Sequence, residues 1–403
     1  MAGGKLQVIA KGGQDSYLIG NPQITYFKIV YRRHTNFAKE SVRQFFTTKP
    51  NYGRILNCTL SRDGDLVQDI YLEINLPTIS SPNSYIYGIG NALIKKVELE
   101  IGGQLIDRHY SEWLNIWEEL SCPPGQRVGL DEMVGNNPGN LTGGRLYVPL
   151  QFWFNRRPGL ALPLAALHKH EVRLHFEIRE NSNLVYTGSA YTTAPAITDD
   201  DFIKVFADYI YLDGDERQRF TQLPMEYLIE QVQFNGDEHY PGNTNSNHAG
   251  TKLSRTSLNF INPVKELIWV YTKDTISNDR NFFFNFSNAA ANVFDTGKLV
   301  LDGVDYQTER NSNYFLLEQN RQHHTNIPRF SESFNQYIYT YSFALRPEEH
   351  QPSGFCNFSR LNESSLVITY PYLTSDWTLK VYAVSYNIFR IVNGMGGLVF
   401  TKL

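Results

Sequence analysis

Two histidines in the segment HEVRLH, His170 and His175, are the first residues whose types and spacing could do chemistry. A zinc protease needs two histidines four positions apart on one helix, so that both rings reach the same metal ion. Here the spacing is five, and the segment alternates as a strand does, which directs the two rings to opposite faces. We therefore predict no metal site in this segment.

A second pair of histidines, His323 and His324, lies in the segment RQHHTNIPR. Adjacent residues of an extended chain point in opposite directions, so they do not easily share one ligand. We interpret both as loop residues that form hydrogen bonds.

Two pairs of neighbouring carboxylates raise the question of glycoside hydrolysis, in which two carboxylates face each other across a sugar. Glu118 and Glu119 fall on a predicted helix, where we expect them on the solvated face. Glu348 and Glu349 fall in the loop LRPEEHQPSG. Nothing selects either pair, so we predict no catalytic residue and no enzyme. A β-sandwich glycoside hydrolase stays open as an alternative, to be tested on polysaccharides.

Other motifs and the composition exclude further classes of function. The sequence has neither a GxxxxGK[ST] phosphate loop nor a GxSxG elbow, so we predict no cofactor. Cys58, Cys122 and Cys356 are scattered without CxxC spacing, which indicates a reducing compartment and no metal knuckle. A formal net charge of -4 provides no basic field for nucleic acid, so no direct nucleic-acid binding is expected.

The N-terminal segment MAGGKLQVIAKGGQ has no apolar core of the signal-peptide type, and Ala2 stands where myristoylation requires glycine. The chain also contains no run of about 18 apolar residues that would span a membrane. Asparagines in N-x-[ST] sequences are therefore weak glycosylation candidates, at a frequency near chance for an Asn-rich chain. These candidates are Asn57, Asn140, Asn285, Asn357 and Asn362.

Short alternating segments recur along the chain and predict an all-β fold. Aromatic residues make up 14% of the chain against 19% charged residues, and Gly, Asn and Pro mark frequent turns. About eight strand-like segments in each half suit a jelly roll or another β-sandwich. Tyr110, Trp113, Leu114 and Trp117 instead recur at helical spacing, so we expect a short helix covering one sandwich edge.

The sequence also repeats itself. The segment VQDIYLEI, from Val67, returns as VKELIWVY 197 positions later, from Val264. VELEIGGQLIDRHYSEWL is answered by GKLVLDGVDYQTERNSNYF, in which the aromatic Tyr314 follows as Trp113 does. PGLALPLAALHKHEVRLHF is answered by PSGFCNFSRLNESSLVITY. Three ordered repeats indicate a duplicated domain of about 190 residues per copy.

These repeats and the turn signals divide the chain. We expect an N-terminal arm over 1–25, a first domain over 26–212, a charged linker over 213–224 and a second domain over 225–403. The segment TYFKIVYRRHTNF is expected to be a strand carrying Arg32, Arg33 and His34, and 236–250 a loop rich in Asn and Gly. The basic cluster suits an acidic partner or a lipid headgroup, or equally an edge strand protected by charge.

Several long segments resemble the major capsid proteins of large icosahedral nucleocytoplasmic double-stranded DNA viruses. These segments are GNPQITYFKIVYRRHTNFA, GGQLIDRHYSEWL, PLQFWFNRRPGLALPLAALHKHEV, RQHHTNIPRF, YSFALRPEEHQPSGFCNFSRL and NIFRIVNGMGGLVF. The resemblance implies two tandem eight-stranded jelly-roll β-sandwich domains with short helices in the loops. It also implies a homotrimer that forms a pseudo-hexameric capsomer and tiles an icosahedral shell together with neighbouring capsomers.

The resemblance further implies a location in the virion, with assembly in the host cytoplasm over an internal membrane. Residues 1–26 and the cluster of Arg32, Arg33 and His34 would then contact minor capsid proteins or the membrane on the inner face. Glycans in this family also occur outside the usual sequons, which weakens the asparagine candidates further. A tandem carbohydrate-binding β-sandwich, monomeric and with exposed aromatic platforms, is the alternative function.

Overall fold

The computed structural model describes residues 3–136, 141–197, 201–242, 252–274, 281–330, 335–371, 373 and 375–401. These form two compact units, Met1–Asn36 and Phe37–Leu403. The smaller unit, which we call the arm, contains α1 (Gly3–Ile9), η1 (Gly13–Asp15) and α2 (Ser16–Ile19), and none of its described residues is buried.

The strand expected over TYFKIVYRRHTNF is wrong, because β1 begins only at Phe37. Residues 29–36 have no regular secondary structure. A strand is stable only where a neighbouring strand accepts and donates its backbone hydrogen bonds. Within the described chain no strand pairs with this segment, so its high β propensity is not realised.

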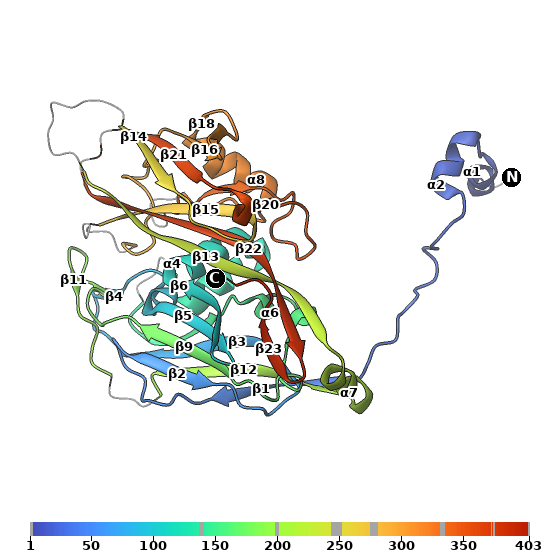
Figure 1. Cartoon of the computed structure of the whole chain (residues 1–403), viewed down its shortest axis with the longest axis horizontal. Coiled ribbons are helices and arrows are strands. Elements are labelled where there is room, and N and C mark those ends of the chain that lie inside the picture. The colour runs from blue at the N-terminus through green and yellow to red at the C-terminus, as the bar shows by residue number, and fades with distance from the viewer. Residues whose placement is uncertain are drawn as a thin grey trace. The chain divides into compact units, whose positions relative to one another are not determined.

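The first half of the larger unit forms two antiparallel sheets that face each other (Figure 1). One sheet has the order β1 (Phe37–Gln44), β12 (Ile203–Leu212), β3 (Leu66–Leu76), β7 (Gly144–Pro149), with β8 (Leu162–Pro163) also on β3. The other has the order β2 (Ile55–Thr59), β9 (Val172–Ile178), β5 (Ile94–Ile101), β6 (Gln104–Tyr110). Strands from both ends of the half thus alternate within each sheet, which is the topology of a jelly roll.

The second half repeats this order. One sheet has β13 (Met225–Tyr240), β22 (Trp377–Val392), β15 (Pro263–Lys273), β19 (Tyr339–Ser342), with β20 (Cys356–Asn357) and β23 (Met395–Leu398) at its margins. The other has β14 (Lys252–Ser257), β21 (Ser364–Tyr370), β16 (Thr296–Leu301), β17 (Val304–Asp305), with β18 (Arg310–Asn311) also on β16. The predicted fold, two tandem jelly rolls, is confirmed.

The sequence repeats fall on topologically equivalent strands. VQDIYLEI lies on β3 and VKELIWVY on β15, each the third strand of its roll. The second repeat covers the hairpins β5–β6 and β16–β17, and the third ends in β9 and β21. On β3, Ile70, Leu72 and Ile74 are buried, as the alternation predicts, and one connected hydrophobic cluster extends through both rolls.

Short helices and a fifth, small sheet lie in the connections. The helices are α3 (Ile89–Leu93), α4 (Ser111–Ser121), η2 (Pro124–Gln126), α5 (Arg127–Val134), α6 (Trp153–Arg156), η3 (Pro158–Leu160), α7 (Gly214–Gln222), the π-helical η4 (Tyr314–Glu318), α8 (Gln319–His323) and η5 (Phe358–Arg360). The small sheet joins β4 (Ser84–Tyr85), β10 (Val185–Tyr186) and β11 (Tyr191–Thr192).

Two connections differ from their expected form. The predicted linker contains α7, whose N-cap Asp213 accepts a hydrogen bond from the backbone of Gly214. The loop expected over 236–250 is wrong at its start, because β13 continues through Gly236 to Tyr240 across a register shift. Residues 243–250 of that loop lie outside the described residues.

Candidate functional site

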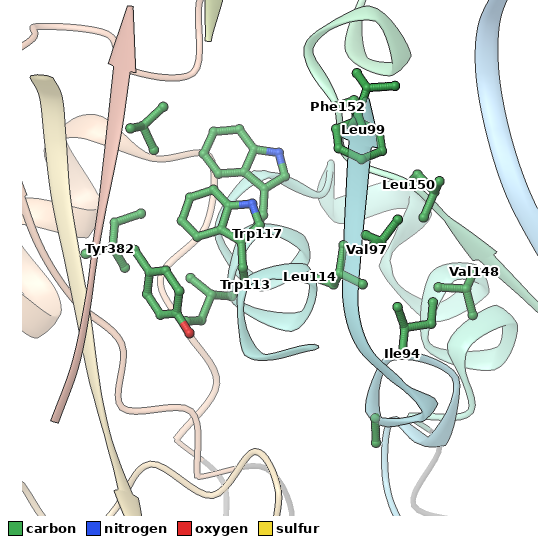
Figure 2. Close-up of a cluster of buried hydrophobic side chains, with 14 of the residues drawn as sticks. Ile94, Val97, Leu99, Trp113, Leu114, Trp117, Val148, Leu150, Phe152 and Tyr382 are labelled. Carbon is green, nitrogen blue, oxygen red and sulfur yellow. The ribbon is translucent and has the colours of Figure 1, made fainter. Parts of the chain in front are cut away.

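The junction between the two rolls is built around α4. The helical spacing of Trp113, Leu114 and Trp117 is confirmed, but the helix does not cover an outer edge of one sandwich. It lies between the rolls (Figure 1), with Leu114 turned toward Val97 of the first roll and both tryptophans turned toward Tyr382 of the second (Figure 2). The ring centroids of Trp113 and Tyr382 are 5.6 Å apart. Both faces of the helix are therefore covered, which buries nearly all of its residues.

Further aromatic pairs continue this junction. Tyr110, at the end of β6, packs on Phe234 of β13 with ring centroids 4.9 Å apart. Trp153 of α6 packs on Phe389 of β22 at 5.9 Å. Pairs of this kind bury large apolar areas and prefer defined geometries. The two rolls are thus held in one fixed orientation by aromatic contacts.

A charged cluster crosses the same junction and overturns one expectation. Helical spacing predicts Glu119 on a solvated helix face, but this residue is only 1% exposed. Arg127 binds it from α5, and Arg329, from the second roll, binds it at 2.6 Å. Arg329 also binds Asp131 at 2.7 Å. A carboxylate becomes buried here because two guanidinium groups, one from each roll, replace its water.

Its neighbour Glu118 is also buried rather than solvated. Asn91 Nδ2 donates a hydrogen bond to Glu118 Oε2 at 2.7 Å. Burial raises the pKa of Glu118 to about 8, although Asn91 and Arg127 act in the opposite direction. This carboxyl group is therefore mostly protonated at neutral pH.

The raised pKa of Glu118 predicts a loss of stability in mild alkali. Because the native pKa of about 8 exceeds the ordinary value of 4.5, the native state holds an extra proton between these pH values. That stabilisation is full below pH 4.5 and is lost as the pH rises through 8. In Glu118→Gln, which keeps a neutral acceptor for Asn91, we expect about 1 kcal/mol less loss between about pH 7 and 9.

Denaturant unfolding of both proteins at several pH values checks this expectation. The difference between them isolates Glu118, since other groups titrate equally in both. Parallel curves for the two proteins from pH 7 to 9 would contradict it.

Two more ion pairs join the rolls. Glu230 of β13 binds Arg156 of α6 at 2.7 Å and the fully buried Lys265 of β15 at 2.6 Å. Lys380 of β22 binds Glu112 of α4 at 2.6 Å. Burial raises the pKa of Glu112, but Lys380 outweighs burial and lowers this pKa. The pair therefore stays ionised at neutral pH.

The histidine pair is structural. His324 is buried between Glu266, 3.3 Å away, and Glu348, 3.0 Å away. Burial lowers the pKa of His324, but the two carboxylates outweigh it and raise the pKa to about 9. His323 hydrogen-bonds the carbonyl oxygen of Leu345 at 3.1 Å. Both histidines thus form hydrogen bonds, as predicted, but they end helix α8 rather than lying in a loop.

One hollow at the junction combines aromatic rings with two carboxyl groups. It has a volume of about 310 Å³ and is lined by Trp117 and Trp153 together with Glu230 and Glu348. A glycosidase needs one carboxyl group with a raised pKa as its acid. Here burial is outweighed by Lys265 at Glu230, and by a histidine at Glu348, so the pKa values of both carboxyls are lowered.

The remaining predicted pairs do not come together. His170 hydrogen-bonds Gly396, whereas His175 hydrogen-bonds Asn57 at 2.7 Å. Glu349 pairs with Arg346 at 3.2 Å. Among the residues that the structure describes, no three His, Cys, Asp or Glu side chains are grouped as metal ligands. Over the same residues, no helix is long and apolar enough to cross a membrane.

The predicted inner-face cluster lies on the arm. Arg32, Arg33 and His34 are exposed, and His34 hydrogen-bonds the carbonyl oxygen of Thr35 at 2.7 Å. Around them the arm exposes large apolar side chains, with Phe27 97% exposed. The role of this cluster stays a prediction.

The glycosylation candidates occupy different surroundings. Asn57 on β2 and Asn362 are exposed, whereas Asn285 and Asn357 are half-buried. Asn140 lies outside the described residues. Glycosylation at any of them stays a prediction.

Sequence reasoning missed the basic second-roll residues at the junction, Arg329, Lys265 and Lys380. Each has no other basic residue close to it in the sequence, so no local spacing marked it. The repeat contained one signal of a buried charge. Lys265 replaces Gln68 within a segment that alternates as a buried strand does.

Comparison with known proteins covers nearly the whole chain. Residues 25–213 match the family model "Major capsid protein N-terminus", and residues 216–397 match "Large eukaryotic DNA virus major capsid protein". The chain is 42% identical to the major capsid protein of Pyramimonas orientalis virus and 38% identical to that of Paramecium bursaria Chlorella virus 1. Both alignments cover 100% of this chain and 100% of the relative.

Solved structures agree with these matches. PBCV-1 VP54 superposes with a TM-score of 0.81 at 33% identity, over 94% of this chain and 100% of that one. The Faustovirus major capsid protein superposes with a TM-score of 0.72 over 95% and 94% of the two chains. At 12% identity, this second likeness shows the shared fold alone.

Proposed function

The chain belongs to the major capsid proteins of large eukaryotic DNA viruses, and from this premise we propose that three copies form a capsomer with six similar lobes. Such capsomers pack as hexagonal tiles with their neighbours in the shell of the virion. The protein acts by assembly and catalyses no reaction.

One observation carries this proposal: two rolls of identical strand order are locked together within a single chain. A tile with six lobes requires a constant angle between the two lobes that each chain supplies. The buried pair Trp113–Tyr382 and the ion pair between the buried Glu119 and the half-buried Arg329 support such a constant angle. A flexible tether between the rolls would let this angle vary.

Measuring the molar mass of the purified chain tests the proposal. We expect a trimer of the 46.3 kDa chain in size-exclusion chromatography with light scattering at micromolar concentration. Its interfaces should bury more than about 2,000 Å² in total, as obligate interfaces do. Electron microscopy should show hexagonal outlines. A monomer that binds glycans would instead favour the carbohydrate-binding alternative.

For the arm, we propose contact with the inner side of the shell, where a membrane and minor capsid proteins lie during assembly in the host cytoplasm. Its exposed apolar residues beside Arg32 and Arg33 suit an anionic lipid surface. Deleting residues 3–36 should leave the trimer intact and abolish co-sedimentation with vesicles that contain anionic lipid. Equal sedimentation of the two proteins would rule out lipid as the partner.

A further inference from the structure

The contact between the two rolls of one chain is head-to-tail. The first roll contributes α4 and the end of β6, whereas the second contributes the outer face of the sheet β13–β22–β15–β19. Because both rolls have the same topology, each chain keeps one surface of each kind that, among the described residues, the other roll does not cover. These are the outer face of β1–β12–β3–β7 in the first roll and the helical segment η4–α8 in the second. On the first-roll sheet, α7 packs Phe220 over Leu66 and Ile210 at one end and leaves the part around Phe206 half-buried.

Strand register identifies the equivalent residues on the two sheets. The sequence repeat aligns Ile70 of β3 with Leu267 of β15. Ala207 lies opposite Ile70, and Ala383 lies opposite Leu267. The residues that precede these two alanines, Phe206 on β12 and Tyr382 on β22, are therefore equivalent as well.

Two further positions follow from the same register. Lys204 aligns with Lys380, so both sheets carry a lysine two residues before the aromatic ring. On the neighbouring strand β1, Arg43 lies opposite Phe206. On β13 of the second roll, Phe234 lies opposite Tyr382 in the same way. We call Arg43, Lys204 and Phe206 the first-roll docking surface.

The two equivalent surfaces differ in how they are covered. Tyr382 is 1% exposed because α4 of the first roll lies over it. Phe206 is only half-buried and stacks on Tyr71 at 5.4 Å. A hollow of about 380 Å³, lined partly by Tyr71 and Tyr147, opens on the same sheet. The aromatic surface around Phe206 is therefore partly exposed on the first roll, whereas the equivalent surface around Tyr382 on the second roll is buried.

The matching helical surface lies on the second roll. In the first roll, Leu114 faces the core of its own sandwich and the preceding residue, Trp113, faces the other roll (Figure 2). In the second roll, Phe315 faces its own core against Trp269, with ring centroids 5.1 Å apart, and the preceding residue is Tyr314. Tyr314 is half-buried, and Leu317, on the next turn, is 39% exposed.

We infer that η4–α8 of one copy docks on the first-roll docking surface of the next copy, with Tyr314 against Phe206. This contact repeats the Trp113–Tyr382 contact and rests on the proposed trimer, to which it adds the surfaces. A head-to-tail contact that repeats through a closing rotation forms a ring. In a ring of three copies there are six lobes. Contacts between the two rolls of one chain then alternate with contacts between rolls of neighbouring chains.

The substitutions between the two junctions fit an external contact. Arg43 stands where the second roll has Phe234, and Asn311 stands where the first roll has Tyr110. Both changes replace an aromatic ring by a polar side chain. Surfaces exposed to water before assembly are more polar than a chain's interior, and this difference keeps the free chain soluble.

Replacing Phe206 with glutamate tests the inference. The glutamate would place a buried charge in each of the three contacts of a trimer. We therefore expect the dissociation constant of the trimer to rise by about 100-fold or more. The matched control is Leu253→Glu, at the far edge of the other sheet of the second roll, where the side chain is 72% exposed. Circular dichroism of both variants verifies that they fold.

Cross-linking tests the pairing itself. The double variant Phe206→Cys with Tyr314→Cys, oxidised by copper phenanthroline, should form covalently linked trimers on a non-reducing gel. Each single variant and the unaltered chain should not, which controls for Cys58, Cys122 and Cys356. Trimers that survive Phe206→Glu, or that never cross-link, would overturn the inference while the proposed function stands. A monomeric unaltered chain would overturn the proposed function itself.

Discussion

Replacing Arg329 with alanine is expected to destabilise the larger unit, Phe37–Leu403, by about 3–5 kcal/mol. The substitution leaves Glu119, which is 1% exposed, and Asp131 to share one guanidinium group, that of Arg127. A buried carboxylate that loses one of two cationic partners keeps its cost of desolvation but loses part of the attraction that offsets this cost. Chemical denaturation followed by tryptophan fluorescence measures the change.

The control for this prediction is an exposed pair from the same roll. Arg321 binds Glu318 at 2.7 Å, with both side chains largely in water. Arg321→Ala should therefore leave the unfolding midpoint nearly unchanged. A second variant, Arg329→Met with Glu119→Gln, removes both charges and should recover much of the loss. If Arg329→Ala unfolds like Arg321→Ala, the cluster does not stabilise the junction.

Local patterns were sufficient to predict the strands and their duplication. The alternation of Ile70, Leu72 and Ile74 places one face inside, and the repeat at Val264 identifies the equivalent strand. These features depend only on period-two burial and on self-similarity of the chain. For this reason the order of the strands in both rolls agrees with the expected fold class.

The environment of α4 could not be predicted in the same way. Helical spacing identifies the helix, but it does not reveal that a second domain covers the other side. Glu118 and Glu119 therefore read as solvated, although both are buried. The partner that buries Glu119 is Arg329, more than half the chain away in sequence. Only the folded arrangement of two domains brings such residues together.

The segment before β1 shows the reverse case. TYFKIVYRRHTNF has the composition of a strand, yet propensity alone does not create one without a neighbouring strand. Within the described chain no strand pairs with this segment, so its β propensity has no partner in one copy. In an assembly protein, segments whose local preference is unmet within one copy are natural points of contact with other molecules.

Replacing Trp113 with alanine is expected to cost about 3–5 kcal/mol and to loosen the two rolls from each other. The side chain is fully buried and packs on Trp117 and Tyr382, with ring centroids 5.6 Å away in both cases. Its removal leaves a cavity between rigid elements that cannot close fully. Hydrogen exchange should therefore increase on both sides of the junction, at β6 and at β13.

Trp269→Ala provides the matched comparison, because Trp269 is equally buried but packs on Phe315 and Tyr339 within the second roll. We expect a similar loss of stability, with increased hydrogen exchange confined to the second roll. If the two variants differ in this way, Trp113 sets the angle between the lobes rather than only the stability of one of them. Identical exchange patterns would mean that the rolls unfold as one unit, and that no single junction residue determines their orientation.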